Sequence, residues 1–147
     1  MKKTFYSTVL KLFDILETVF TIAFVVSMAL LLNEEEYSLK IISGVLVLIA
    51  VLYWLMSLEP KSENDSLLKL YTSKATWLTL SIGVLGILMK LQFDEKANLL
   101  LLLGFLSIIF SVILNIYLYI KEKNKIKPAV FVRASIYILI CLYLYTL

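Results

Sequence analysis

The chain has 147 residues, of which 61% are hydrophobic, and its formal net charge is +3. Its mean hydropathy is +0.93, and a water-soluble domain of this size has too much surface for its volume to hide so much apolar area. The sequence has no histidine and a single cysteine, Cys141, which excludes a histidine general base, an intrachain disulfide and a cysteine metal cluster. The lysines are spread between apolar runs, so we expect no nucleic-acid partner. The sequence carries no recognisable catalytic or cofactor motif, so we also expect no cofactor and no enzymatic activity.

The first apolar run covers residues 15–32 and follows a polar start that carries Lys2, Lys3 and Lys11. A lysine-rich start before an apolar run is also typical of a signal peptide. The run ends in an asparagine and three glutamates, however, and no cleavage site of small residues follows. These features predict a first membrane helix that is kept in the protein.

Four further apolar runs follow, and each is long enough to cross about 30 Å of hydrocarbon. Backbone groups cannot stay unpaired in lipid, so each run is expected to form a helix. Pro60 and Pro128 lie between runs, where a missing N–H does no harm. The sequence therefore predicts an all-α, polytopic bundle of five transmembrane helices with up-down topology. We expect one membrane domain over residues 1–147, with later helices at 41–58, 75–91, 99–120 and 129–147.

Residues 59–74 are predicted to form the main cytoplasmic loop. Asp65 or Ser66 could cap a helix that starts at Leu67, so the third helix is expected to project beyond the membrane.

The positively charged residues alternate between the two sides of the predicted bundle. With five crossings, one side collects eleven Lys and Arg residues and the other side three. By the positive-inside rule the N-terminus is expected in the cytoplasm and the C-terminus outside, in a bacterial cytoplasmic membrane. Aromatic residues agree with this orientation. Those predicted to mark the cytoplasmic interface are Tyr53, Trp54, Tyr71, Trp77, Tyr117 and Tyr119.

A weak internal repeat appears when the chain is shifted by 60 residues. The shift places Gly44 on Gly104, Leu39 on Leu99, and the acidic pair 34–35 on the acidic pair 94–95. One interpretation is a duplicated helical hairpin, because parallel repeats occur in transporters. The other is that any two hydrophobic hairpins align this well.

Residues 82–104 carry a pattern of two glycines in a helix, a turn, Ala97-Asn98, and a leucine-rich helix with Gly104. This segment resembles a helical hairpin of the L subunit of the Bacteroidota gliding-motility and type IX secretion motor, and of related small membrane proteins of that phylum. The turn holds Phe93-Asp94-Glu95-Lys96 in place of the His-Trp-Pro-Gly of that pattern. The resemblance implies a bacterial source and a style of helix packing. It does not imply motor activity, because the matching hairpin has no acid at mid-helix.

Two helices carry stripes of small and polar residues, which allow backbones to approach closely and hydroxyls to bond across helices. The residues predicted to pack the third helix against the fourth are Thr79, Gly83, Gly86, Gly104, Ser107, Ser111 and Asn115. The alternative is a solute path between the two helices. Lys90, at the end of its run, is expected to extend to water along its aliphatic stem.

Glu17 and Arg133 are predicted to form an ion pair in the cytoplasmic leaflet. Both lie a turn or two inside their apolar runs, and Glu17 shares a helix face with Asp14, Thr18 and Thr21. A guanidinium partner would relieve both unpaired charges. The alternative is that Arg133 alone reaches the membrane surface.

Two classes of function remain. The sequence favours a structural or accessory subunit that contacts lipid and other membrane subunits or copies of itself, because no site chemistry is visible. The alternative is a small transporter or channel that works as an oligomer, whose small-molecule substrate stays unknown.

Overall fold

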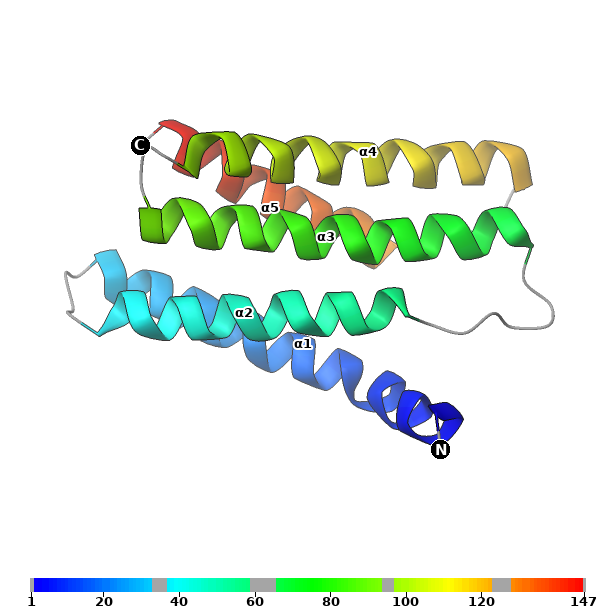
Figure 1. Cartoon of the computed structure of the whole chain (residues 1–147), viewed down its shortest axis with the longest axis horizontal. Coiled ribbons are helices and arrows are strands. Elements are labelled where there is room, and N and C mark those ends of the chain that lie inside the picture. Colours follow the sequence, from blue (N-terminus) through cyan, green and yellow to red (C-terminus); the bar gives the residue numbers. More distant parts are fainter. Residues whose placement is uncertain (1, 33–36, 59–65, 94–96, 123–127, 147) are drawn as a thin grey trace.

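The computed structural model describes residues 2–32, 37–58, 66–93, 97–122 and 128–146. These residues form five helices and no strand: α1 (Lys2–Leu32), α2 (Ser38–Ser57), α3 (Leu67–Phe93), α4 (Asn98–Glu122) and α5 (Pro128–Thr146). The helices run alternately up and down, and the two chain ends lie at opposite ends of the bundle (Figure 1). Helices α2 to α5 are long and apolar enough to cross a membrane. The predicted all-helical class is confirmed.

Two helices begin earlier than the apolar runs predict. Helix α3 begins at Leu67 rather than at residue 75, so part of the predicted loop 59–74 is helical. Ser66 caps it as expected, because the Ser66 hydroxyl accepts a hydrogen bond from the Lys69 backbone N–H at 3.1 Å. Helix α1 begins at Lys2 rather than at residue 15. Hydropathy detects only the apolar part of a helix, whereas polar residues with good helix propensity continue the helix into water.

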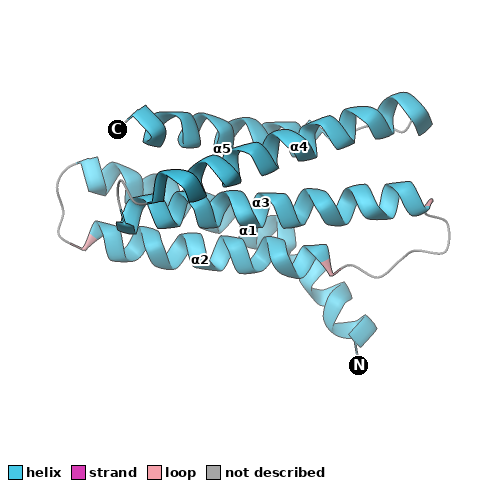
Figure 2. Cartoon of the chain, turned by 45° about the horizontal axis from the view of Figure 1, so that its top comes forward, coloured by secondary structure: helices cyan, strands magenta, loops and turns pink. Residues whose placement is uncertain are grey.

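The helices form two layers. Helices α2, α3 and α4 lie side by side, with α1 behind α2 and α5 behind α3 and α4 (Figure 1). The second view shows the same neighbours, with the N-terminal part of α1 projecting beyond the end of α2 (Figure 2). Helix α3 is central because it packs against α2, α4 and α5. Within the described part of the chain, no Cα of α1 lies within 8 Å of a Cα of α5. The two helices of the back layer are therefore separated.

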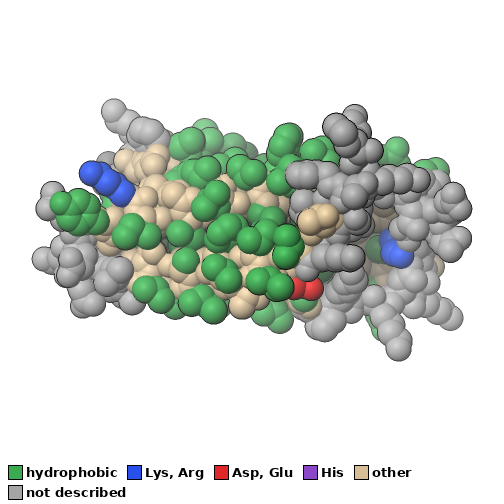
Figure 3. Space-filling model, turned by 90° about the horizontal axis from the view of Figure 1, so that it is seen from below, with side chains coloured by type: hydrophobic (Ala, Val, Ile, Leu, Met, Phe, Trp, Pro, Cys, Tyr) green, Lys and Arg blue, Asp and Glu red, His purple; other side chains and the backbone are tan. Residues whose placement is uncertain are grey.

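The outer surface of the bundle is apolar. Large side chains such as Ile15, Val51, Leu103 and Leu139 are between 46% and 66% exposed. Seen from below, hydrophobic side chains cover the middle of the molecule, and the acidic side chain in view lies at the edge of this belt (Figure 3). A soluble monomer does not expose apolar patches of this extent, so this surface is suited to lipid.

Lysines lie over tyrosine rings at two places near the ends of the bundle. The Lys40 ammonium is 5.9 Å from the ring centroid of Tyr37 at the start of α2. The Lys121 ammonium is 5.7 Å from the ring centroid of Tyr117 near the end of α4. Tyrosine and lysine are the residues that anchor helices at membrane–water interfaces. Because α2 and α4 run in the same direction, the two pairs mark opposite ends of the bundle.

Candidate functional site

The stripes of α3 and α4 meet face to face. A Cβ built at Gly86 would lie 2.8 Å from the Leu100 carbonyl oxygen, and one built at Gly104 would lie 3.1 Å from the Gly83 Cα. A Cβ built at Gly83 would overlap the side chain of Ile108. The two backbones thus approach as closely as glycine permits. Between these glycines no space remains for a solute.

Hydroxyl and amide groups extend this contact toward the Leu67 end of α3. The Asn115 amide donates to the Thr76 hydroxyl at 2.7 Å, and the Ser107 hydroxyl lies 3.2 Å from the Thr79 carbonyl oxygen. Ser111 is fully buried, and its hydroxyl has no hydrogen-bond partner among the described residues. All seven stripe residues therefore lie in or beside the α3–α4 contact. Thr76, the partner of Asn115, was not among the residues predicted.

Lys90 differs from its predicted arrangement. It lies in the last turn of α3, and only 7% of the residue is exposed. The expected extension to water would leave the end of the side chain accessible. Lys90 is instead almost fully covered.

Glu17 of α1 and Arg133 of α5 lie together, as the sequence predicts. The Arg133 Nη2 donates to the Glu17 Oε2. Only 12% of the Glu17 side chain and 19% of the Arg133 side chain are exposed. The pair bridges the two helices of the back layer, whose backbones stay apart. A bridge of this kind needs two long side chains, because nothing shorter spans the gap.

Two buried tyrosines continue the polar contact into the bundle. The Tyr53 hydroxyl of α2 donates to the Glu17 Oε1 at 2.8 Å and lies 3.1 Å from the Tyr137 hydroxyl of α5. A phenol has one proton, so the Tyr137 hydroxyl must donate to Tyr53 while Tyr53 donates to Glu17. Both carboxylate oxygens of Glu17 thus accept a hydrogen bond. This series of hydrogen bonds ends at Tyr137, since Tyr137 has no further polar partner within the described residues.

Two more aromatic rings lie beside the guanidinium of Arg133. Its Cζ lies 5.5 Å from the ring centroid of Phe13 and 5.4 Å from that of Trp77. The Phe13 and Trp77 rings meet edge to face, with centroids 5.1 Å apart. An arginine within about 6 Å of an aromatic face gains a cation–π attraction, which is larger where water is excluded. The guanidinium therefore joins α5 to α1 and α3, and Glu17 adds α2 to the site through Tyr53.

The placement of Tyr53 and Trp77 corrects the predicted aromatic belt. Tyr53 is 1% exposed, and Trp77 is half-buried within this cluster. Trp54 and Tyr71, by contrast, are exposed. Position along a helix does not give the direction of a side chain, which depends on the neighbours that surround the helix. Trp54 and Tyr71 therefore remain candidates for the predicted aromatic belt, whereas Tyr53 and Trp77 belong to the interior cluster.

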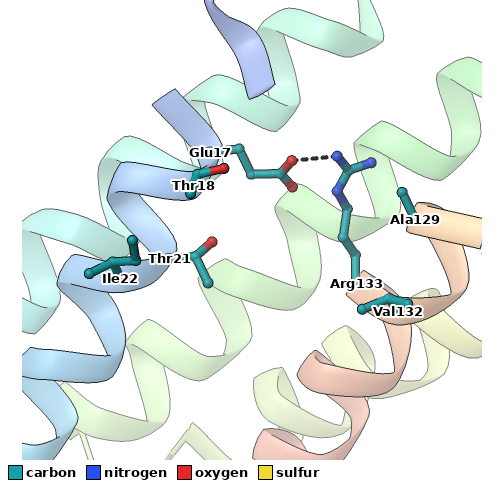
Figure 4. Close-up of a pocket in the computed structure, with 7 residues that line it drawn as sticks. All are labelled: Glu17, Thr18, Thr21, Ile22, Ala129, Val132 and Arg133. Atoms are coloured by element: carbon teal, nitrogen blue, oxygen red, sulfur yellow. Dashed lines mark hydrogen bonds and ion pairs between the residues drawn. The ribbon is translucent and has the colours of Figure 1, made fainter. Parts of the chain in front are cut away.

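A groove of about 330 Å³ lies beside the ion pair, between α1 and α5 (Figure 4). Its α1 wall holds Glu17, Thr18, Thr21 and Ile22, and its α5 wall holds Ala129, Val132 and Arg133. The Arg133 side chain points back toward Ala129 and the start of α5, and the Thr21 hydroxyl points into the space between the walls (Figure 4). Polar groups thus gather at one end of a groove whose other lining is apolar.

Of the four residues predicted to share a face of the first helix, three line this groove. Asp14 is exposed and lies outside the lining, and its carbonyl oxygen accepts the Thr18 hydroxyl at 2.7 Å. The described residues contain no group of three His, Cys, Asp or Glu side chains that could hold a metal ion. The chemistry offered by the site is that of paired charges and hydrogen bonds.

Comparisons of the chain with protein-family models, with curated proteins and with solved structures give no match. The resemblance of residues 82–104 to the motor subunit stays a prediction. The information on function therefore comes from the geometry of the described helices.

Proposed function

We propose that the chain is a five-span protein of a bacterial cytoplasmic membrane that serves as a structural or accessory subunit of a membrane complex. Helices α2 to α5 supply four spans by length and apolar composition. For the fifth, residues 15–32 of α1 contain one ionisable side chain, Glu17, and that side chain is paired. A paired and hydrogen-bonded acid at the start of an apolar run is tolerated in a membrane.

The orientation that we propose has the N-terminus in the cytoplasm and the C-terminus outside. The alternation of lysines along the sequence supports it, because cytoplasmic segments carry an excess of Lys and Arg. Five of the fourteen Lys and Arg residues, at positions 61, 96, 123, 125 and 127, lie outside the described residues. An odd number of crossings agrees with chain ends at opposite ends of the bundle (Figure 1).

The closed contact between α3 and α4 carries the proposal of a structural role. A transporter was expected to use the polar stripes of these helices as a solute path. The Gly83, Gly86 and Gly104 backbones instead fill that space, and Asn115 and Ser107 bond across it. This arrangement supports a role in helix packing over transport. A scaffold needs a rigid centre of this kind, with its apolar outer surface left for lipid and neighbouring subunits.

The test is the composition of the native assembly. The tagged chain would be extracted from its own membranes into lipid nanodiscs, and the mass and subunit content of the particles would be measured. We expect a larger particle with a second membrane protein in fixed ratio. Particles that contain only copies of this chain, and that release a solute from liposomes, would overturn the structural role in favour of the transporter.

A further inference from the structure

We propose that the groove between α1 and α5 binds the headgroup of a zwitterionic phospholipid with a primary ammonium group, such as phosphatidylethanolamine. In this arrangement the lipid phosphate contacts Arg133 and the ammonium contacts Glu17. The inference rests on the proposed membrane insertion of α1 and goes beyond the structural role.

The groove opens sideways from the bundle. Ile22 on one wall and Val132 on the other are each 58% exposed, so the lining continues onto the outer surface of the helices. In a protein inserted as proposed, this surface faces lipid rather than water. The molecule that reaches the groove at membrane depth is therefore a phospholipid, whose acyl chain matches the apolar walls.

The polar end of the groove has unused hydrogen-bonding capacity. A guanidinium has five N–H donors, and among the described residues Arg133 donates only to Glu17. A carboxylate offers about four acceptor positions, and Glu17 accepts only from Arg133 and Tyr53 in the same part of the chain. Thr21 points into the groove and has no hydrogen bond to any described residue (Figure 4). Partly buried polar groups are expected to find partners.

The charges of the site select the kind of headgroup. Glu17 and Arg133 together are neutral, so a headgroup with a net negative charge would gain at Arg133 and lose at Glu17. A zwitterion offers an acceptor to the guanidinium and a donor to the carboxylate. A trimethylated ammonium has no N–H to donate. The complementary headgroup therefore has both a phosphate and a primary ammonium.

The depth of the site suits a headgroup. Helical side chains lean toward the N-terminus of their helix, and Arg133 points back toward Ala129, which directly follows Pro128 at the first position of α5. The guanidinium is thus close to the level at which α5 begins. The Glu17 carboxylate meets the guanidinium and lies at the same level (Figure 4), and the N-terminal end of α1 lies at the same end of the bundle as the start of α5 (Figure 1). Both charged groups reach the level of the lipid headgroups, whereas Ile22 and Val132 lie along the acyl chain.

The test measures lipid retention by the purified full chain. Detergent micelles would be supplied with dioleoyl phosphatidylethanolamine, phosphatidylcholine or phosphatidylglycerol at equal concentration, and bound lipid would be counted by native mass spectrometry. We expect roughly a tenfold preference for phosphatidylethanolamine over phosphatidylcholine, the ratio supplied by one charge-assisted hydrogen bond. Equal retention of the three lipids, or tighter binding of phosphatidylglycerol, would overturn the proposal.

Matched variants separate the site from the general surface. Glu17→Gln should abolish the preference, whereas Asp14→Asn, which changes an exposed acid one turn away and outside the groove, should keep it. Val132→Trp places a large side chain at an exposed position in the groove and should lower retention of phosphatidylethanolamine without unfolding the chain. The Val132 variant decides the question if Glu17→Gln does not fold. Retention unchanged by Val132→Trp would contradict the site.

Alkaline extraction of membranes separates the two proposals. A chain released by alkaline carbonate would contradict membrane insertion, and with it the proposed function. A chain that stays in the membrane but shows no lipid preference would contradict the lipid site alone.

Discussion

Arg133 makes two kinds of stabilising contact, and a charge swap can separate them. Its guanidinium pairs with Glu17 and lies beside the Phe13 and Trp77 rings. Glu17→Arg and Arg133→Glu should each lower the free energy of unfolding by about 2–4 kcal/mol, because each leaves like charges in a partly buried place. The double variant restores the pair of opposite charges, but its guanidinium no longer starts from position 133 beside the Phe13 and Trp77 rings. We therefore expect recovery of about half of the loss, measured by thermal unfolding in detergent. Additive losses would show that the pair contributes no coupling.

Tyr53 and Tyr137 should differ when each loses its hydroxyl. Tyr53→Phe removes a donor from Glu17 and leaves the buried Tyr137 hydroxyl without an acceptor. We expect a loss of about 1–3 kcal/mol, whereas Tyr137→Phe leaves the bond to Glu17 intact and should cost about 0.5–1.5 kcal/mol. The double variant removes both hydroxyls, so its cost should fall below the sum. A larger loss for Tyr137→Phe than for Tyr53→Phe would contradict the direction of the hydrogen-bond chain.

At the level of helices, the contact between α3 and α4 depends on glycine, and Gly44 provides a matched control. Gly86→Ala should cost about 1–3 kcal/mol, because the new Cβ would lie 2.8 Å from a backbone oxygen that cannot move aside. Gly83→Ala should cost less, since the Ile108 side chain can shift. Gly44→Ala should cost nothing, because no atom lies within 4 Å of the Cβ position. The measurement is the unfolding temperature of each variant in the same detergent. Equal effects at Gly44 and Gly86 would mean that α3 and α4 do not meet as described.

The same comparison bears on the proposed duplication of hairpins. The 60-residue shift aligns Gly44 with Gly104, but Gly104 lies against α3 while Gly44 is exposed and meets nothing. The acidic pairs of the alignment, 34–35 and 94–95, fall outside the described residues. The two aligned glycines therefore do not share a packing role, and the duplication of hairpins stays a prediction.

For the molecule as a whole, the single buried cysteine allows a clean test of topology. Cys141 is 2% exposed, so labelling of introduced cysteines should have little background. Tyr37→Cys and Tyr71→Cys place thiols at exposed positions toward opposite ends of the bundle. With a membrane-impermeant maleimide on intact cells, we expect labelling at position 37 and none at position 71 until the cells are permeabilised. The reverse pattern would place the N-terminus outside.

The sequence predicted most of the helices because each apolar run shows where a chain can lie in lipid. The apolar runs alone give the starts of α1 and α3 too late, since polar residues such as Lys69 continue a helix; for α3 the capping residue Ser66 still indicated the start at Leu67. Glu17 and Arg133 were found because charge is rare in such runs. Two other members of the cluster, Phe13 and Tyr137, lie four residues from Glu17 and from Arg133 respectively, which was the available signal. Tyr53 and Trp77 could not be found, because their role depends on how α2 and α3 sit between α1 and α5.

The separation of α1 from α5 has a consequence for biogenesis. In the proposed five-span topology α1 enters the membrane first and α5 last, so Glu17 would have no guanidinium partner until the rest of the chain has been made. Closing the Glu17–Arg133 bridge is then the final event that joins the back layer. A chain cut after residue 122 would keep the α3–α4 contact but leave Glu17 facing lipid. We expect this shortened chain to be degraded faster than the full chain in pulse-chase labelling, and Glu17→Leu in the shortened chain to slow its loss.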